Sequence, residues 1–169
     1  MFEEVNFKSL DINASKIIGD QWMLITAKKE DKINTMTASW GGFGKLWFKD
    51  VSFIFVRHSR FTHEFIENSE YYSLCFFTEK HRKDLNYLGI TSGRNEDKIK
   101  KVGLTIVDTD LAPYFKEADI VVICRKIYKD EVKKRKFIDQ EIYKPAYKTR
   151  DMHTVYVGEI VKTLKNNYK

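Results

Sequence analysis

A short segment after an apolar run carries the side chains best suited to chemistry. VSFIFV, residues 51–56, is followed by RHSRFT, in which Arg57 and Arg60 bracket Ser59 and Thr62 lies just beyond. Guanidinium groups, hydroxyl groups and the free amides of a helix start are the groups that bind a phosphate monoester. Arginine usually pairs with a surface carboxylate, but two arginines beside two hydroxyl groups, directly after a buried strand, favour a phosphate site.

A second segment has the pattern of a strand edge that faces a flat ring. NTMTASW, residues 34–40, alternates small hydroxyl or amide residues with apolar ones and ends on an aromatic. Such an edge can offer backbone hydrogen bonds to the rim of a planar heterocycle. Trp40 and Trp47 also fit packing in a core or at a subunit interface. The ring-binding strand and the phosphate-binding strand end together predict a mononucleotide site.

A third segment, TSGRNEDKIKKVG at residues 91–103, predicts a small loop before a short helix. The loop is Ser-Gly-Arg at 92–94, and Asn95 is expected to cap a helix with Ile99 and Val102 facing inward. Glycine allows close backbone approach, and a helix start favours an anion. The segment is therefore a further candidate for contact with a phosphate.

The elements that position these segments are mostly strands. The patterns predict strands at residues 22–28, 34–40, 51–56, 71–77, 120–128 and 153–165, with a polar turn at 29–34. Gly41, Gly42 and Gly44 interrupt the pattern, so residues 41–48 are expected to form a loop. About six or seven strands with short helices between them predict a mainly β fold, an antiparallel barrel or sandwich.

The remaining elements are short. One helix is expected at 63–69, capped by Ser59 or Thr62, and another at 79–89, with Leu85 and Leu88 inward and Gly89 as the stop. The stretch from 137 to 151 has no regular pattern. Gly158 is expected to mark a bulge or a close-packing point in the last strand.

Composition points to one folded domain over residues 1–169. A chain of 169 residues suffices for one sizeable core, and 14% aromatic with 32% charged residues argues against disorder. The N-terminus has no apolar signal segment, and the apolar runs are far shorter than the roughly 20 residues of a membrane helix. Cys75 and Cys124 occur singly, so we expect buried thiols in a reducing cytoplasm and no metal site.

The net charge of +6 admits an anionic partner, but the excess is spread along the chain. Its densest cluster, KKRK at 133–136, is interpreted as a solvated hairpin end. Aromatic residues are not interleaved with these lysines, as a surface that stacks on bases would need. We therefore expect neither nucleic acid nor a membrane as a partner.

Three separated blocks together resemble one known family. NTMTASWGG, FVRHSRFTHEFI and SGRNEDKIKKVGL are similar to the flavin reductase domain family, the FMN-binding split-barrel proteins that include flavoredoxin and the reductase components of two-component monooxygenases. The resemblance extends from about Asn34 to Ile160, and HTVYVGEI matches the last barrel strand. The sequence departs at His58, where many relatives have proline, which affects loop rigidity and not charge. The resemblance implies a six-stranded antiparallel split barrel, usually a homodimer, with FMN in a groove near the subunit boundary.

The resemblance also implies roles for the matching residues. The isoalloxazine ring would be lined by Met36, Thr37, Ala38, Ser39 and Trp40. The ribityl phosphate would be held by Arg57, Ser59, Arg60 and Thr62. The family's SGxxxDK pattern, close to the flavin, matches Ser92, Gly93, Asp97 and Lys98.

The start of the last strand adds a candidate catalytic residue. His153 matches a histidine that lies near the nicotinamide side in some family members, and Asp151 would fix its tautomer. A purely structural role for this histidine stays open. Tyr143 and Tyr147, around Pro145, fit either a lid over the groove or an ordinary packed loop.

The implied activity is reduction of FMN by NADH or NADPH. Hydride passes directly from nicotinamide C4 to flavin N5, so the protein must stack two rings, exclude water and place positive charge near the flavin N1 and O2 edge. The sequence shows no Ser-His-Asp set, HExxH or dinucleotide-binding glycine pattern, since GGFG at 41–44 has the wrong spacing. The nicotinamide cofactor is therefore expected to visit the exposed flavin face.

Two other functions use the same residues or the same fold. An electron carrier that keeps its FMN would receive electrons from a redox protein, and a monooxygenase would be a partner of a reductase. A small basic barrel that binds single-stranded nucleic acid would be colourless and salt-sensitive, and fold alone does not exclude it. We expect a homodimer that acts on small nucleotide substrates.

Overall fold

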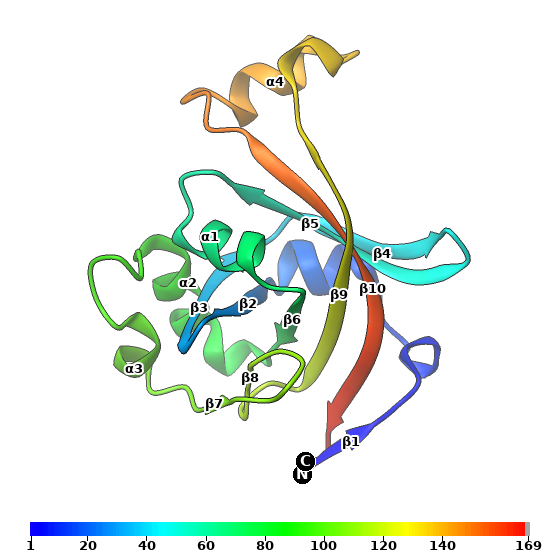
Figure 1. The fold of residues 1–169 in the computed structure, drawn as a ribbon, viewed down its shortest axis with the longest axis vertical. Coiled ribbons are helices and arrows are strands. Elements are labelled where there is room, and N and C mark those ends of the chain that lie inside the picture. Colours follow the sequence, from blue (N-terminus) through cyan, green and yellow to red (C-terminus); the bar gives the residue numbers. More distant parts are fainter. Residues whose placement is uncertain (168–169) are drawn as a thin grey trace.

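The computed structural model describes residues 1–167, and an antiparallel sheet dominates them (Figure 1). The strands are β1 (Phe2–Glu4), β2 (Met23–Lys29), β3 (Lys32–Ala38), β4 (Gly41–Leu46), β5 (Lys49–Arg57), β6 (Tyr71–Phe76), β7 (Ile106–Val107), β8 (Tyr114–Phe115), β9 (Ile120–Glu131) and β10 (His153–Asn166). The main sheet follows the order β3-β2-β6-β9-β10-β5-β4, with β1 paired to β10, while β7 and β8 form a separate pair.

The chain passes from one edge of the main sheet to the other through Ser39 and Trp40 alone. β3 and β4 are the two ends of the strand order, yet Gly41 follows Ala38 after these two residues. Six steps of about 4.8 Å would separate the edges of a flat sheet by roughly 29 Å, whereas three peptide units span at most about 11 Å. The sheet must therefore roll up. This confirms the expected mainly β, antiparallel barrel, and the lack of a β3–β4 ladder within residues 1–167 makes it a split one.

Alternate residues along the central strands belong to two different cores. Ile25 of β2, Leu74 of β6 and Val122 of β9 pack in the core inside the barrel. Their neighbours Leu24 and Cys75 belong to a second core, between the sheet and the helices outside it. Because side chains alternate across a strand, burial on both faces makes these strands read as continuous apolar runs.

Short helices cover the sheet and close one end of the barrel. The α-helices are α1 (Phe61–Asn68), α2 (Arg82–Ile90), α3 (Lys98–Val102) and α4 (Gln140–Ala146). The 3-10 and π turns are η1 (Phe7–Ser9), η2 (Ser15–Asp20), η3 (Glu79–His81) and η4 (Lys134–Lys136). Leu85 and Leu88 of α2 are buried as expected, and α4 lies beyond the ends of β9 and β10, away from the other helices (Figure 1). Over residues 1–167, every helix is too short or too polar to cross a bilayer.

β4 shows that the prediction of a loop over residues 41–48 was wrong. Its backbone pairs with β5 from Gly41 to Leu46, and the chain reverses at residues 47–48. The glycines fit the strand because the Phe53 ring covers it: a Cβ on Gly42 or Gly44 would lie 3.9 or 3.6 Å from that ring. An aromatic cover of this kind depends on the partner strand, so the glycine pattern alone does not reveal it.

Two predicted helix caps were also wrong. Asp97, not Asn95, caps α3, and its carboxylate accepts the backbone N–H of the third helical residue at 3.1 Å. α1 begins after Arg60 and has no side-chain cap, while Thr62 lies inside the helix. Ser59 makes a different contact, described below. For α3, Asn95 and Asp97 are both residues that favour a cap, so the sequence alone did not decide between them; for α1, the residue before the helix is Arg60, whose side chain makes no capping bond.

Two further boundaries differ from the sequence expectation. α2 continues past Gly89 to Ile90, and Gly89 instead permits close packing, since a Cβ there would lie 3.1 Å from Cβ of Thr37. Residues 137–151 are not irregular throughout, because they contain α4 with Asp139 as its capping residue. The cap was visible in the sequence, but Pro145 obscured the helix that follows it.

Gly158 confirms the expected close-packing point in the last strand. The register between β10 and β9 shifts at Val157 and Gly158. A Cβ on Gly158 would lie 2.8 Å from Cβ of Cys124 and would overlap the Tyr72 hydroxyl group. Both Cys75 and Cys124 are free and buried, as predicted, and burial raises the pKa of each thiol to about 12.

Candidate functional site

The end of β3 forms one side of a cavity of about 220 Å³. Its lining residues are Met36, Thr37, Ala38, Ser39, Trp40, Phe55, Arg57, Arg60 and His153. All five residues predicted to line the ring, Met36 to Trp40, thus line one cavity. β3 is an edge strand of the split barrel, so within residues 1–167 its outer backbone N–H and C=O groups have no ladder partner. A planar ligand with donors and acceptors on its rim can bind such an edge.

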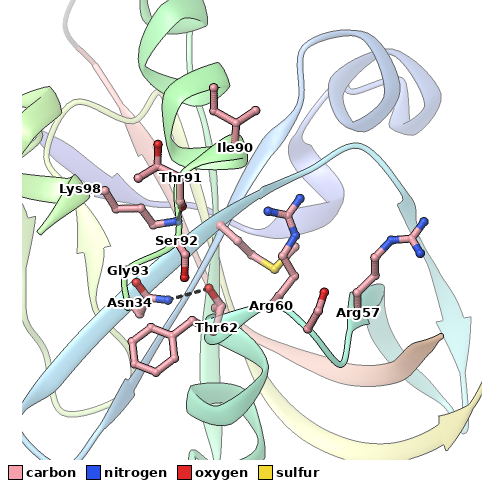
Figure 2. Close-up of a pocket in the computed structure, with 12 residues that line it drawn as sticks. Asn34, Arg57, Arg60, Thr62, Ile90, Thr91, Ser92, Gly93 and Lys98 are labelled. Atoms are coloured by element: carbon pink, nitrogen blue, oxygen red, sulfur yellow. Dashed lines mark hydrogen bonds between the residues drawn. The ribbon is translucent and has the colours of Figure 1, made fainter. Parts of the chain in front are cut away.

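A second cavity, of about 330 Å³, adjoins the first, and both are lined by Met36, Arg57 and Arg60. Its other lining residues are Asn34, Ser59, Phe61, Thr62, Ile90, Thr91, Ser92, Gly93 and Lys98 (Figure 2). The Asn34 amide donates to the Thr62 hydroxyl at 2.9 Å, which ties α1 to β3. Gly93 packs so closely here that a Cβ would overlap the Asn34 amide oxygen. Hydroxyl groups and a close backbone approach therefore meet at this end.

Two cations of the second cavity bind the carbonyl end of α2. Arg60 donates to the Gly89 carbonyl, and the Lys98 ammonium donates to the carbonyls of Leu88 at 2.7 Å and Thr91 at 2.8 Å. The last carbonyls of a helix lack partners within it, so cations stabilise them. Lys98 is only 3% exposed, and burial, followed by the charge of Arg60, lowers the pKa of its ammonium group to about 8.

Arg57 lies where the two cavities meet, next to the end of β10. One terminal nitrogen donates to the Asp151 carbonyl at 2.7 Å, and the other donates to the Ala146 carbonyl at 2.9 Å. The central guanidinium carbon lies 5.3 Å from the centre of the Tyr147 ring and 5.9 Å from that of Trp40. These contacts fix the charged group between two aromatic rings. Tyr147 is buried, which agrees with the packed-loop interpretation of this segment.

His153 does not pair with Asp151, so that expectation was wrong. Its Nδ1 atom lies 2.9 Å from the Tyr147 hydroxyl oxygen. The Asp151 carboxylate instead accepts hydrogen bonds from the Ser59 hydroxyl at 2.5 Å and the Ser59 backbone N–H at 3.1 Å. Burial, followed by the charge of Arg57, lowers the pKa of His153 to about 4. The imidazole is therefore neutral at pH 7.

Every predicted site residue except Asp97 lines one of these two cavities. Asp97 caps α3 and lines a neighbouring cavity, which Gly93 and Lys98 also line. Their individual contacts with a flavin stay predictions. Sequence reasoning missed five lining residues: Asn34, Phe55, Phe61, Ile90 and Thr91. Asn34, Phe61 and Thr91 belong to the three segments that the sequence singled out and were recognisable, whereas Phe55 and Ile90 are placed only by folding.

The donor set of the two cavities fits a flat ring that carries a phosphate. Among residues 1–167, no carboxylate side chain lines either cavity, whereas Arg57, Arg60 and Lys98 all do. Burial, followed by the charge of Arg57, lowers the pKa of Arg60, so the cluster of like charges carries a free-energy cost that an anion would relieve. The combined volume lies within the roughly 300–1,000 Å³ of small-molecule sites. These residues therefore fit FMN.

The sequence matches a family model over almost its whole length. Residues 16–168 match the family described as flavin reductase like domain. An uncharacterized protein of Archaeoglobus fulgidus is 30% identical over 139 residues, which cover 78% of this chain and 64% of that protein. The chain thus spans slightly less than two thirds of the length of this relative.

Several solved structures are similar in fold. An FMN-binding domain of a flavin reductases-like enzyme from Shewanella baltica has a TM-score of 0.70 and 14% identity, and the match covers 98% of this chain and 77% of that structure. Flavoredoxin of Desulfovibrio vulgaris has a TM-score of 0.67 and 22% identity, and the match covers 86% of this chain and 69% of that structure. An NADH:FAD oxidoreductase of Streptomyces globisporus has a TM-score of 0.63 and 14% identity, and the match covers 86% of this chain and 75% of that structure. At these identities the likeness shows the split-barrel fold.

Proposed function

The chain belongs to the flavin reductase like domain family, and we propose that it binds FMN and reduces it with NADH or NADPH. The observation that carries this proposal is the junction of two cavities of different chemistry at Met36, Arg57 and Arg60. One cavity has a free strand edge and aromatic residues, and the other has hydroxyl groups and cations. A single ligand with a flat ring at one end and a phosphate at the other would satisfy both.

The residues divide by the part of FMN that each would hold. The end of β3 from Met36 and the link that follows it as far as Trp40 would bond the rim of the ring through their backbone, with Thr37 and Ser39 as side-chain candidates. Thr62 and the loop at Ser92 would face the phosphate. The cations nearby would balance its negative charge.

The chemistry of such a site requires positioning more than proton transfer. A bound FMN supplies a ring that accepts hydride, so the protein needs no nucleophile of its own. Trp40 is 45% exposed beside the β3 edge and would shield the ring from water on one side while leaving access for a second ring. His153 is neutral at pH 7, since its pKa is about 4, and would act as a hydrogen-bonding wall of the cavity and not as an acid.

Use of a nicotinamide cofactor rests on two further observations. The first cavity is open at the exposed residues Ser39 and Trp40, so that a second flat ring can reach the ring-binding edge. One of the similar structures is described as an NADH:FAD oxidoreductase. The proposal covers both NADH and NADPH, because the residues named above would contact the flavin and not the part of the cofactor in which the two differ.

The proposal is tested by an absorption spectrum of the protein mixed with FMN, followed by NADH and then NADPH without air. We expect FMN to bind and the flavin bands to bleach with at least one of the two. The variant Arg125→Gln should bind FMN and bleach like the unmodified protein, since Arg125 pairs with Glu159 and lines neither cavity. A protein that binds no FMN, or whose bound flavin stays oxidised with both cofactors, would contradict the proposed activity.

The likeness to flavoredoxin favours a second candidate function, an FMN electron carrier that depends on a redox protein. Such a carrier would retain its FMN through purification and would not oxidise NADH with free flavin as acceptor. Turnover that begins only after a redox protein is added would favour the carrier. Steady turnover with NADH and excess FMN would favour the reductase.

We also propose a homodimer that passes its electrons to a monooxygenase or another redox protein. Trp47 and Phe48 at the tip of the β4–β5 hairpin are large exposed aromatic side chains, as expected of a contact between copies. Free, buried Cys75 and Cys124 suit a reducing compartment, and we place the protein in the cytoplasm on this basis.

A further inference from the structure

The two arginines of the RHSRFT segment have different surroundings. Arg60 donates to the end of α2, inside the second cavity. Arg57 lies opposite His153 in the ladder between β5 and β10 and is held from the other side, by carbonyls of the segment at 146–151. In Figure 2 the guanidinium group of Arg57 lies apart from the cluster of Asn34, Thr62 and Ser92. A shared role in binding one phosphate does not follow from their closeness in sequence.

The end of the site near Arg57 is unfavourable for a phosphate. The Ser59 hydroxyl and N–H, two natural phosphate donors, are both occupied by the Asp151 carboxylate. A phosphate that replaced this contact would have to displace a negative charge or lie beside it, and like charges at contact distance raise the free energy of both. The hydroxyl groups of Thr62 and Ser92 have no such neighbour among the residues that line the second cavity.

Arg57 still has donors to offer to a ligand. A guanidinium group has five N–H donors, and only two are used by the carbonyls of Ala146 and Asp151. Those two bonds and the Trp40 and Tyr147 rings fix the orientation of the group. The group lines the first cavity together with the β3 edge, where a flat ring would lie.

From this arrangement we propose that Arg57 binds the ring of the flavin, at the edge that gains negative charge on reduction, and that it does not bind the phosphate. This inference rests on the proposed FMN site and assigns one residue within it. A fixed positive charge at that edge favours the reduced ring over the oxidised one. Arg57 would thus set the reduction potential of the bound flavin as well as its affinity.

The test compares FMN with riboflavin, which has the same ring and no phosphate. For Arg57→Gln we expect both affinities to fall by the same factor, about 10- to 100-fold for a lost hydrogen bond to a charged group. For Thr62→Val we expect the FMN affinity to fall and the riboflavin affinity to stay. Arg125→Gln, with its surface ion pair, should change neither.

The reduction potential of bound riboflavin gives an independent measurement. Arg57→Gln should lower this potential, by about 30 mV for each tenfold by which it weakens the reduced form more than the oxidised form. Arg57→Lys, which keeps the charge, should restore most of that shift. A purely structural role would lower the melting temperature without separating the two redox forms.

Four results would overturn the inference. A variant Arg57→Gln that loses affinity for FMN alone would place the arginine on the phosphate. Unchanged affinities, or a shared loss of affinity with an unchanged potential, would each show that Arg57 is a structural residue. If the unmodified protein binds neither FMN nor riboflavin, the proposed function fails together with this inference, whereas the first three results affect the inference alone.

Discussion

His153 shows how strongly the surroundings of one side chain change its chemistry. It is buried, faces the Tyr147 hydroxyl, and has the Arg57 guanidinium nearby, so burial and then charge lower its pKa to about 4. The unfolded chain has an ordinary histidine that binds a proton below about pH 6.5. Between about pH 6.5 and 4 the unfolded state therefore binds more protons than the folded state.

The contribution of His153 to the free energy of unfolding should accordingly be constant above pH 6.5 and fall as the pH decreases to 4. The loss attributable to His153 is at most about 3 kcal/mol. It is measured as the difference in the free energy of unfolding between the protein and His153→Gln across this range. Ring resonances of His153 that titrate near pH 6.5 in the folded protein would contradict the expected pKa.

At this scale the sequence identified residue types better than their partners. The segments around Trp40, Arg57 and Ser92 do line the site, because local sequence places them on strand ends and loops. The pairing of His153 with Asp151 was wrong, since the Tyr147 hydroxyl comes from a segment whose position only the folded chain determines.

At the scale of the elements, the carbonyl end of α2 is stabilised by a cation from α3. Lys98 binds two carbonyls at the end of α2 while buried, and the pKa of its ammonium group is lowered to about 8. In the unfolded chain the same group titrates near 10.5. Between pH 8 and 10.5 the unfolded state binds the extra proton, so stability should rise with pH across this window.

The rise attributed to Lys98 is at most about 3 kcal/mol. Lys98→Met removes the titrating group, and its unfolding free energy should lack this increase, although it is lower overall because two carbonyls lose their partner. Chemical unfolding at a series of pH values measures both. Parallel pH profiles for the two proteins would show that Lys98 titrates normally.

β10 can pack closely against Tyr72 and Cys124 only because Gly158 has no side chain. Gly158→Ala places a methyl group against Tyr72 and Cys124, so we expect a loss of about 1–3 kcal/mol from overpacking. Gly19→Ala is the matched control, because a Cβ at Gly19 meets nothing within 4 Å. Equal melting temperatures for the two variants would contradict the close packing.

The elements themselves were largely predictable, and their exceptions share a cause. The strands β2, β5, β6, β9 and β10 follow from apolar runs, whose residues are buried in the two cores on either face of the sheet. β4 was missed because its glycines are compensated by the ring of Phe53 on the neighbouring strand. Asn95 was assigned the cap that Asp97 provides, because two cap-forming residues that lie two positions apart satisfy the same local rule.

For the whole molecule, the closure of the sheet follows from one connection and not from any strand. Six or seven antiparallel strands suit a sandwich as well as a barrel. The two-residue link through Ser39 and Trp40 decides between them, but only once β4 is known to be a strand. The resemblance to a known family supplied this step where the strand pattern could not.

The tip of the β4–β5 hairpin tests the proposed homodimer. Trp47 and Phe48 both have positive φ, 47° and 61°, which a tight hairpin turn favours for Asn and Gly rather than for aromatics. Phe48 is 98% exposed. Phe48→Gly should therefore raise monomer stability by about 1 kcal/mol and weaken self-association in sedimentation experiments.

Ile138→Ser is the control for that experiment, since Ile138 is fully exposed on a distant segment. It should leave self-association unchanged. If both variants associate like the unmodified protein, the hairpin tip is not in the interface.

The two cysteine thiol groups can report on rare opening of the barrel. Cys75 and Cys124 lie on the neighbouring strands β6 and β9, both are fully buried, and burial raises the pKa of each to about 12. An alkylating reagent can therefore react only in molecules whose central strands have separated. A flavin that binds only the closed molecule should slow alkylation by about 100-fold when present at 100 times its dissociation constant. Mass spectrometry of intact protein counts the modified molecules, and a rate insensitive to flavin would mean that ligand and reagent act on unrelated motions.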